Sequence, residues 1–385
     1  MRREASPVRP DFAAQAEKIG FAYAYMDGEI YWDESARYIF SLRQIEDHFE
    51  AATAELWALC EELVGRIVAS QEKMDRLAVP AHAREIIAAS WKRRDPSLYG
   101  RFDFAYDGKT APKLLEFNAD TPTSLFESAV VQWFWLEQMI ASGALPQGAD
   151  QFNSLHEKLI ARWAEIGAGR FLHLACMASS VEDRGTTAYI EECARQAGLE
   201  TRLIDMGDIG LRANGGFADR FGRDIALMFK LYPWEWMFAE AFGRAPALAT
   251  TAFVEPAWKT LLSNKAILAL AWEMAQGHPN LLPAYIEVES GARRLGRNFA
   301  RKPFFSREGG NVELHEGARI VAGPDLNYGG PCVVQALNPL PEFDGNYPVV
   351  GCWLVGGEPA GMGLREDRSL ITSNRSRFVP HAIVD

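Results

Sequence analysis

The chain of 385 residues has only five cysteines, and no two of them form a CxxC pair. They are Cys60, Cys176, Cys193, Cys332 and Cys352. Cysteines scattered in this way indicate neither a disulfide framework nor a zinc site. We therefore expect a reduced, cytoplasmic protein.

Long apolar runs and an excess of basic charge are also missing. No segment reaches the roughly 18 apolar residues of a membrane helix, and no apolar stretch follows the basic N-terminus as in a signal peptide. The net charge is −11. A nucleic acid or an anionic membrane requires a basic surface, so neither is expected as a partner. A metal ion or a polyamine suits an acidic protein better.

The composition, with 48% hydrophobic and 24% charged residues, is that of a globular protein. Its length favours two or three closely packed subdomains. Apolar residues recur at helical spacing in four segments. The first, Ser35–Met74, predicts a long amphipathic scaffold helix or a pair of helices. The others predict helices at His82–Arg94, Leu125–Ile140 and Phe152–Ile166.

An α/β unit is predicted in the middle of the chain. Strands at Phe171–Met177 and Thr201–Asp205 flank a helix at Glu182–Gly198, and a further apolar strand covers Ile225–Leu231. The first turn lacks the GxGxxG pattern, so dinucleotide binding is unsupported.

The stretch 101–124 carries the most informative pattern. Residues alternate on both sides of an Asp-Gly turn, which predicts a β-hairpin. Side chains two apart on a strand share a face, so Arg101 and Asp103 should lie opposite Glu116 and Asn118. Carboxylate and amide oxygens are Mg²⁺ ligands, and an arginine beside them suits a developing anionic charge. The alternative is a solvated hairpin face held by salt bridges.

The segment that follows the hairpin, 118–124, is rich in short polar side chains and predicts a substrate-binding loop. Farther along, Tyr232–Trp236 predicts a loop that sets Glu235 between two indoles. This loop either buries an interface or forms the wall of a cation pocket, where the rings add cation–π attraction.

The last third of the chain predicts a helix at Asn264–Ala275 and strands at Phe299–Lys302, from Asn311, and at Cys332–Leu337. The pair Gly309-Gly310 is either an ordinary hairpin turn or a flexible turn whose backbone N–H groups meet phosphates. It is not a Walker loop, because the GxxxxGK[ST] order is absent. Taken alone, Lys265 and Lys302 are better explained as exposed charges of a helix and a strand than as ligand-binding residues.

Several motifs in the same order resemble the glutathionylspermidine synthase family. They are RFD, LLEFNADTPTS, NKA, KPFFSREGGNV, GMGLRED and SRFVPH, and they span most of the chain. The resemblance is to the synthetase part alone, since no Cys-His amidase region precedes it. It implies an ATP-grasp carboxylate–amine ligase of α/β (α+β) class, using ATP and Mg²⁺.

The resemblance also implies a division of the chain. Residues 1–165 would hold N-terminal helices and the metal-binding hairpin, and 166–252 a small pre-ATP-grasp α/β lobe. Residues 253–385 would form the nucleotide-binding lid and the C-terminal strands. Metal ligands that precede the lysines, as here, are a feature of this family.

Roles for individual residues follow from the resemblance. Lys265 and Lys302 would contact the nucleotide phosphates, Gly309 and Gly310 would form a mobile lid, and Gln335 and Leu337 would meet the adenine. The family pattern further places two arginines at the transferred phosphoryl group and three residues at the substrates. These are Arg101 and Arg365, and Thr121, Thr123 and Glu235. The pattern gives no firm role to Arg377.

The expected reaction joins an acid to an amine through an acyl phosphate, with a peptide such as glutathione and a polyamine such as spermidine as candidates. One alternative is an ATP- and Mg²⁺-binding pseudoenzyme that acts through a protein partner. Another is a hydrolase with Asp103 and Glu116 as its acid/base pair. The sequence does not predict an oligomeric state.

Overall fold

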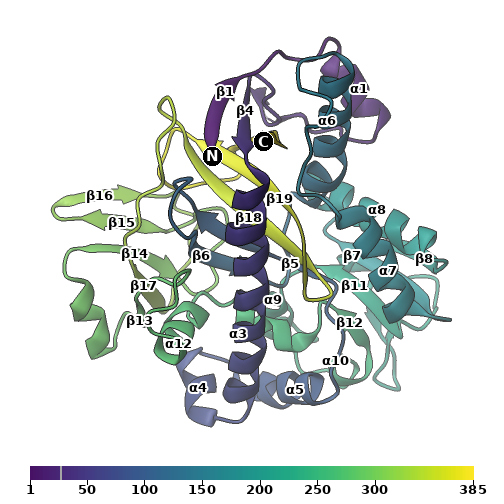
Figure 1. The fold of residues 1–385 in the computed structure, drawn as a ribbon. Helices are drawn as coiled ribbons and strands as arrows, with labels where there is room; N and C mark the ends of the chain where they lie inside the picture. The colour runs from purple at the N-terminus through teal and green to yellow at the C-terminus, as the bar shows by residue number, and fades with distance from the viewer. Residues whose placement is uncertain (27) are drawn as a thin grey trace.

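The computed structural model describes residues 1–26 and 28–385 and shows a mixed α/β protein (Figure 1). Three larger sheets and one smaller sheet account for most strands. Across these residues, no helix combines the length and apolarity that a bilayer crossing demands.

The predicted hairpin is confirmed and lies at the edge of a five-stranded antiparallel sheet. Its strands are β5 (Tyr99–Ala105) and β6 (Lys113–Asn118). The register pairs Arg101 with Asn118 and Asp103 with Glu116. The sheet order is β20-β19-β18-β5-β6, and its other strands come from the end of the chain. These are β18 (Tyr347–Val355), β19 (Glu358–Asp367) and β20 (Arg377–Val379).

One face of this central sheet is apolar and is covered by α3 (Ala51–Val68), which crosses it in Figure 1. Phe102 and Phe117 stack there with ring centroids 3.9 Å apart, and Trp57 of α3 meets Phe117 edge-on. Because successive side chains of a strand alternate between faces, burying these rings turns the charged residues of the hairpin to the opposite face.

The predicted α/β unit is also confirmed, as a four-stranded parallel sheet in the order β12-β11-β7-β8. Its strands are β7 (Phe171–Cys176), β8 (Glu200–Asp205), β11 (Leu227–Leu231) and β12 (Ala252–Val254). The helices α7 (Leu155–Gly167) and α8 (Val181–Gln196) pack on each other beside it. The side chain of Ser180 caps α8 by accepting from the backbone N–H of Asp183.

A second five-stranded antiparallel sheet, here called the lid sheet, has the order β13-β17-β14-β15-β16. Its strands are β13 (Ala284–Ile286), β14 (Asn298–Pro303), β15 (Glu313–Glu316), β16 (Arg319–Ala322) and β17 (Cys332–Ala336). The apolar helix α12 (Ile267–Met274) packs on β13 and β17. The strand that the sequence predicted from Asn311 is β15, which begins two residues later at Glu313.

The prediction of a helix from Ser35 is wrong at its start. Ala36–Phe40 is strand β4, which pairs with β1 (Arg2–Ala5) and, in parallel, with β21 (His381–Ile383). Both chain ends meet there (Figure 1). Pairing with strands from the two ends overrides the local helical spacing, and helix begins only after the capping box at Ser41.

The remaining elements complete the fold. They are α1 (Phe12–Lys18), β2 (Tyr25–Met26), β3 (Glu29–Ile30), α2 (Leu42–Gln44), η1 (Ile45–Glu50), α4 (Gln71–Arg76), α5 (Ala81–Lys92), η2 (Glu127–Val131), α6 (Gln132–Ala141), η3 (Met206–Asp208), β9 (Gly210–Leu211), β10 (Phe217–Ala218), α9 (Trp234–Ala239), α10 (Ala247–Thr250), η4 (Ala257–Lys259), α11 (Thr260–Ser263) and η5 (Ser290–Leu295).

Arg377 belongs to a buried network that joins the small N-terminal sheet to the central sheet. The carboxylate of Glu366 on β19 is fully buried and accepts from Arg3, Tyr38 and Arg377. Arg377 also donates to Asp33 at 2.7 Å. These contacts give Arg377 a structural task, which the sequence pattern did not reveal.

Replacing Glu366 by alanine should destabilise the fold by about 3–5 kcal/mol, because it removes a fully buried carboxylate and leaves two partly buried guanidinium groups without their counter-ion. Urea unfolding measures the change. Glu62→Ala, which removes an exposed pair with Arg66 on α3, should cost less than about 1 kcal/mol. Equal losses of unfolding free energy in the two variants would show that the buried network stabilises the fold no more than an exposed ion pair does.

Candidate functional site

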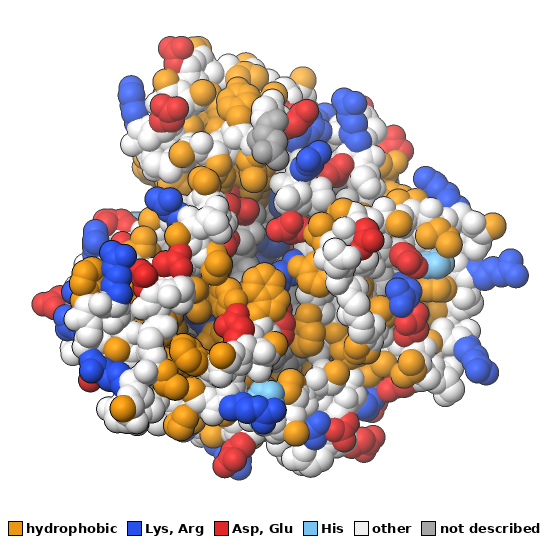
Figure 2. Space-filling model, turned by 180° about the vertical axis from the view of Figure 1, so that it is seen from behind, with side chains coloured by type: hydrophobic (Ala, Val, Ile, Leu, Met, Phe, Trp, Pro, Cys, Tyr) orange, Lys and Arg blue, Asp and Glu red, His pale blue; other side chains and the backbone are white. Residues whose placement is uncertain are grey.

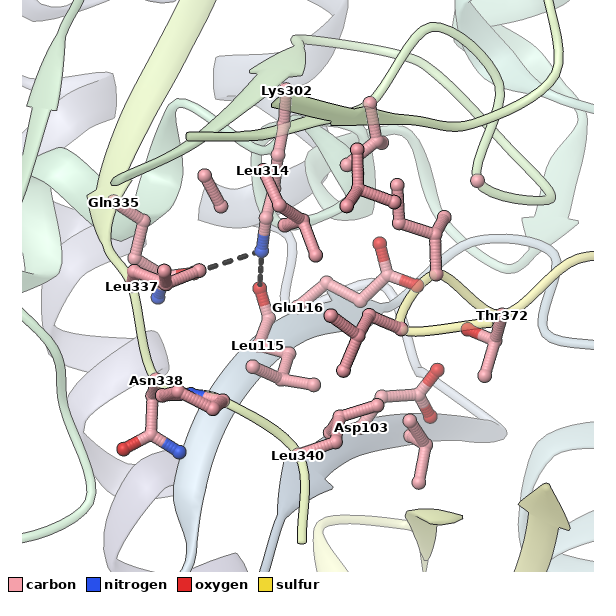
Figure 3. Close-up of a pocket in the computed structure, with 18 of the residues that line it drawn as sticks. Asp103, Leu115, Glu116, Lys302, Leu314, Gln335, Leu337, Asn338, Leu340 and Thr372 are labelled. Carbon is pink, nitrogen blue, oxygen red and sulfur yellow. Dashed lines mark hydrogen bonds between the residues drawn. The ribbon is translucent and has the colours of Figure 1, made fainter. Parts of the chain in front are cut away.

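A cavity of about 1090 Å³, counting the space at its mouth, lies between the central sheet and the lid sheet. The hairpin contributes Asp103, Leu115 and Glu116 to its wall, and the lid sheet contributes Lys302 and Gln335 (Figure 3). The space-filling view shows the molecule hollowed near its centre, with acidic and basic side chains side by side around the hollow (Figure 2).

Asp103 is buried and is held by two arginines. Arg101 donates to its two oxygens at 2.6 and 3.0 Å, and Arg365 of β19 donates at 2.7 Å. Asn118 adds a bond from its amide at 3.1 Å. The hairpin and β19 therefore bring Arg101, Asp103, Asn118 and Arg365 into one patch, although Arg365 lies 262 residues after Asp103.

Glu116 projects into the same cavity and pairs with Lys265 at 2.8 Å. Burial alone would raise the pKa of Glu116, but Lys265, Lys302 and Arg101 outweigh it and hold this pKa well below its usual range. Lys265 also donates to the carbonyl of Ser306 at 2.7 Å. Glu116 therefore stays an anion near neutral pH.

The donor set on this face fits Mg²⁺. It comprises the carboxylates of Asp103 and Glu116 and the amide of Asn118, which hydrogen-bonds to both. In the part of the chain that the structure describes, no three His, Cys, Asp or Glu side chains gather closely enough to hold a metal by themselves. Mg²⁺ needs only one or two protein carboxylates when phosphates and water complete its shell.

Lys302 of β14 points into the cavity (Figure 3). It donates to the carbonyl of Leu115 and to the side chain of Gln335, both at 2.8 Å, and Gln335 donates to the carbonyl of Leu114 at 2.9 Å. Burial lowers the pKa of Lys302 to about 8. Leu337 lines the cavity just beyond β17, and its backbone N–H is bonded to Asn298 at 3.2 Å.

The turn that joins β14 to β15, residues 304–312, is here called the glycine turn. Gly309 has φ +69°, and a Cβ there would lie 2.5 Å from the carbonyl oxygen of Thr372. A Cβ on Gly310 would lie 2.8 Å from the ring of Tyr328. Only glycine allows the turn to lie this close to its neighbours, and Gly309 forms part of the cavity wall.

A smaller recess, of about 280 Å³ when the open space at its mouth is counted, adjoins the cavity and includes Asn118, Thr121, Lys265 and Arg307 in its wall. Arg307 of the glycine turn donates to the hydroxyl of Thr121 at 2.5 Å and to Glu235 at 2.6 Å. Sequence reasoning assigned no role to Arg307. Its place two residues before the glycine pair was the only signal available.

The prediction of a loop at Tyr232–Trp236 is wrong after Pro233, because α9 begins at Trp234. A proline just before the first helical residue suits a helix start. The indoles do lie near cations, but these belong to the protein. Lys230 is 4.8 Å from the ring of Trp234, and Arg307 is 5.9 Å from that of Trp236.

Three acidic residues, here called the acidic cluster, lie near the loop after the hairpin. They are Glu127, Glu182 and Asp183, and the sequence analysis did not single them out. Glu127 accepts from the hydroxyl of Tyr31 at 2.7 Å, and Thr123 lies close enough to Glu182 to oppose the rise in pKa that burial causes in that carboxyl. Thr123 also accepts a bond from Arg101 at its carbonyl, which connects the cluster to the hairpin.

The acidic cluster is electrostatically strained. Burial, reinforced by Glu182, raises the pKa of Glu127 to about 8. Burial and Glu308 raise the pKa of Asp183 to about 6. The second carboxylate oxygen of Glu127 is buried and finds no hydrogen-bond partner among the residues that the structure describes. A cation bound among these groups would relieve this strain.

The helices α8 and α9, which carry the acidic residues described above, both begin at the carboxyl ends of parallel strands. α8, with Glu182 and Asp183 in its first turn, follows β7, and α9, with Glu235 in its first turn, follows β11. β7 and β11 are neighbours, and the chain leaves β7 for β8 on its other side. In open α/β sheets, such a switch point is the usual place for a ligand.

The structure therefore brings most of the predicted site residues together. One cavity is lined by Asp103, Glu116, Lys265, Lys302, Gly309, Gln335 and Leu337. The other predicted residues lie beside this wall. Arg101, Asn118 and Arg365 donate to Asp103, and the carbonyl of Thr123 accepts from Arg101. Thr121 and Glu235 accept from Arg307, and Gly310 follows Gly309 in the glycine turn. The functional roles of all these residues stay predictions.

Comparison with known proteins gives a match that covers nearly the whole chain. The family model described as "Glutathionylspermidine synthase preATP-grasp" matches residues 3–384. A protein of Haemophilus influenzae, provisionally described as an acid–amine ligase, is 40% identical over 98% of both chains.

Longer relatives match over part of their length. The trypanothione synthetase of Crithidia fasciculata is 29% identical over 87% of this chain and 53% of its own. The bifunctional glutathionylspermidine synthetase/amidase of Escherichia coli is 26% identical over 94% of this chain and 62% of its own. Among solved structures, a glutathione synthetase-like effector from Globodera pallida shares the fold, with a TM-score of 0.58 and 11% identity over 99% of this chain and 100% of its own.

The raised pKa of Glu127 predicts a pH-dependent cost to folding. Unfolded, this carboxyl titrates near 4.5, and folded near 8, so the native state binds the extra proton between these values and stability falls as pH rises through them. Glu127→Gln mimics the neutral form. Its melting temperature relative to the wild type should therefore rise from pH 5 to pH 9, and a difference that does not depend on pH would contradict the assignment.

Proposed function

Because the chain belongs to the glutathionylspermidine synthase family, we propose that it is an ATP-dependent ligase that joins a carboxylic acid to an amine. The observation that carries this proposal is the shared cavity. Two carboxylates from the early hairpin and two lysines from the later half of the chain line it together. A nucleotide triphosphate and its metal require this combination of charges.

We assign the nucleotide to the cavity between the two sheets, in an ATP-grasp arrangement. Lys265 and Lys302 bind the phosphates, and Gln335 and Leu337 bind the base. The glycine turn closes over the phosphates. In this scheme residues 1–165 and 253–385 build the nucleotide site, and 166–252 form the pre-ATP-grasp lobe that supplies the substrate side.

Asp103, Glu116 and Asn118 would hold Mg²⁺, which when bound neutralises charge on the triphosphate. To reach this state, Glu116 gives up Lys265, and the phosphates become the new partner of that lysine. Asp103 keeps Arg101 and Arg365 in place by the bonds described above. Lys265 therefore has a carboxylate partner before the nucleotide arrives and a phosphate partner afterwards.

The first chemical step forms an acyl phosphate. A carboxylate oxygen of the acid attacks the γ-phosphorus of ATP, the bond to the bridging oxygen breaks, and ADP is released. Arg101 and Arg365 lie beside the carboxylates and stabilise the charge on the group in transfer.

In the second step the amine nitrogen attacks the acyl carbon, phosphate leaves, and the nitrogen loses a proton. The product is an amide. Thr121, Thr123 and Glu235 orient the substrates, with Arg307 between Thr121 and Glu235. The charge of the acidic cluster suits a cationic amine, and the family name suggests glutathione or another peptide acid with spermidine or another polyamine.

The assay that tests the proposal measures ADP release with Mg²⁺ and a panel of peptide acids and amines. Release should require both an acid and an amine. Glu116→Gln should lower the turnover number by at least about 100-fold with the fold intact, because the neutral amide is a weak Mg²⁺ ligand. Glu313→Gln on β15, whose carboxylate pairs with His315, is the matched control and should retain activity. Unimpaired turnover by Glu116→Gln would refute the metal assignment.

Amine binding should depend on pH through Asp183. The pKa of this carboxyl is raised to about 6, so it is ionised above that pH and protonates below it. The KM for the amine should therefore rise as pH falls from 7.5 to 5, while the KM for ATP stays nearly constant. In Asp183→Asn the KM for the amine should be high at every pH in this range and should not rise further as the pH falls. A rise of the amine KM that persists in Asp183→Asn would come from the titration of another group.

A further inference from the structure

Asp120, directly before Thr121, makes contacts that the proposed reaction does not use. Its side chain is fully buried and lies between β11 and α9. One carboxylate oxygen accepts from the ammonium group of Lys230 at 2.7 Å. The other accepts from the backbone N–H of Trp234, the first residue of α9, at 2.8 Å. These two bonds connect the loop after the hairpin to the four-stranded parallel sheet, which contains β11.

Lys230 is also fully buried, and its remaining contacts lie in the same turn. It donates to the carbonyl of Tyr232 at 2.8 Å and lies over the ring of Trp234. Burying two opposite charges is costly, and the attraction between them offsets this cost only when their geometry is well defined. The pair therefore fixes the loop against the turn that leads from β11 into α9.

The same two segments are joined a second time, one residue farther along each. Thr121 and Glu235 both accept from Arg307, which reaches them from the glycine turn. Residues 120 and 121 of the loop thus face residues 234 and 235 of α9. The contact between Asp120 and Trp234 is direct and buried. The contact between Thr121 and Glu235 runs through the guanidinium group of Arg307, which belongs to the glycine turn.

We propose that Asp120 is a positioning residue: its buried bonds to Lys230 and Trp234 set the spacing of Thr121 and Glu235, so that Arg307 bridges both and holds the glycine turn closed over the substrates. The inference rests on the proposed function for its catalytic consequence. Its structural part, the docking of the glycine turn, is independent of any activity.

The structural part is tested by hydrogen–deuterium exchange of residues 304–312. Asp120→Leu combined with Lys230→Met removes both buried charges without leaving either one alone, so this variant should fold. Exchange in the glycine turn should become at least about threefold faster, as in Arg307→Ala. Asp219→Ala, which removes another buried carboxylate of the same lobe, should leave exchange of the turn unchanged. Unchanged exchange in the double variant would overturn the proposal.

The catalytic part is tested by a mutant cycle with Arg307. Asp120→Ala should lower kcat/KM for the acid and the amine by about 10- to 100-fold in the wild-type background. It should lower them by less than about threefold when Arg307 is already alanine, because the two residues act through one contact. Losses that multiply independently would show that Asp120 acts elsewhere and overturn the catalytic consequence.

The two measurements separate the possible failures. Faster exchange in a protein that releases no ADP with any acid and amine pair would refute the proposed function and leave the positioning role standing. Normal exchange in an active ligase would refute the positioning role alone.

Discussion

The alternation of side chains across the β5–β6 hairpin is the constraint on which the rest of the site depends. One face stacks Phe102 on Phe117 against α3, and burial of these rings fixes the register. The other face must then present Arg101, Asp103, Glu116 and Asn118 together. A slip of one residue would bury the charges and expose the rings, so the fold and the site are secured by the same apolar contacts.

The partners of the hairpin come from the far end of the chain. β18 pairs with β5, and Gly351 on β18 leaves room for Arg101, whose Cδ would lie 2.7 Å from a Cβ at that position. β19 then carries Arg365 to Asp103. The buried carboxylate of Asp103 is tolerated here because Arg101 and Arg365 both lie within hydrogen-bond distance of it.

Local patterns were sufficient for the hairpin and for the α/β unit, because both depend on residues close in sequence: an Asp-Gly turn between alternating strands, and a short apolar strand followed by a capped helix. The same reasoning failed for Ala36–Phe40. Its strand character comes from β1 and β21, and β21 lies more than 300 residues away.

The sequence also predicted residues that line the cavity between the two sheets, chiefly through the family resemblance, but it did not reveal how they contact one another. The bridge from Arg307 to Thr121 and Glu235 joins three separate segments, and no periodicity encodes it. The acidic cluster was missed for a related reason. Glu182 and Asp183 read as ordinary acidic residues of a helix start, and only the fold brings Glu127 near them.

The central claim is that hairpin carboxylates and later lysines act on one nucleotide. The most direct measurement is calorimetric titration of a non-hydrolysable ATP analogue, with and without Mg²⁺, into the wild type and Lys302→Met. The account predicts binding that Mg²⁺ strengthens in the wild type and that Lys302→Met weakens by at least about tenfold, since it removes a buried phosphate partner. Equal affinity in the two proteins, unaffected by Mg²⁺, would contradict it.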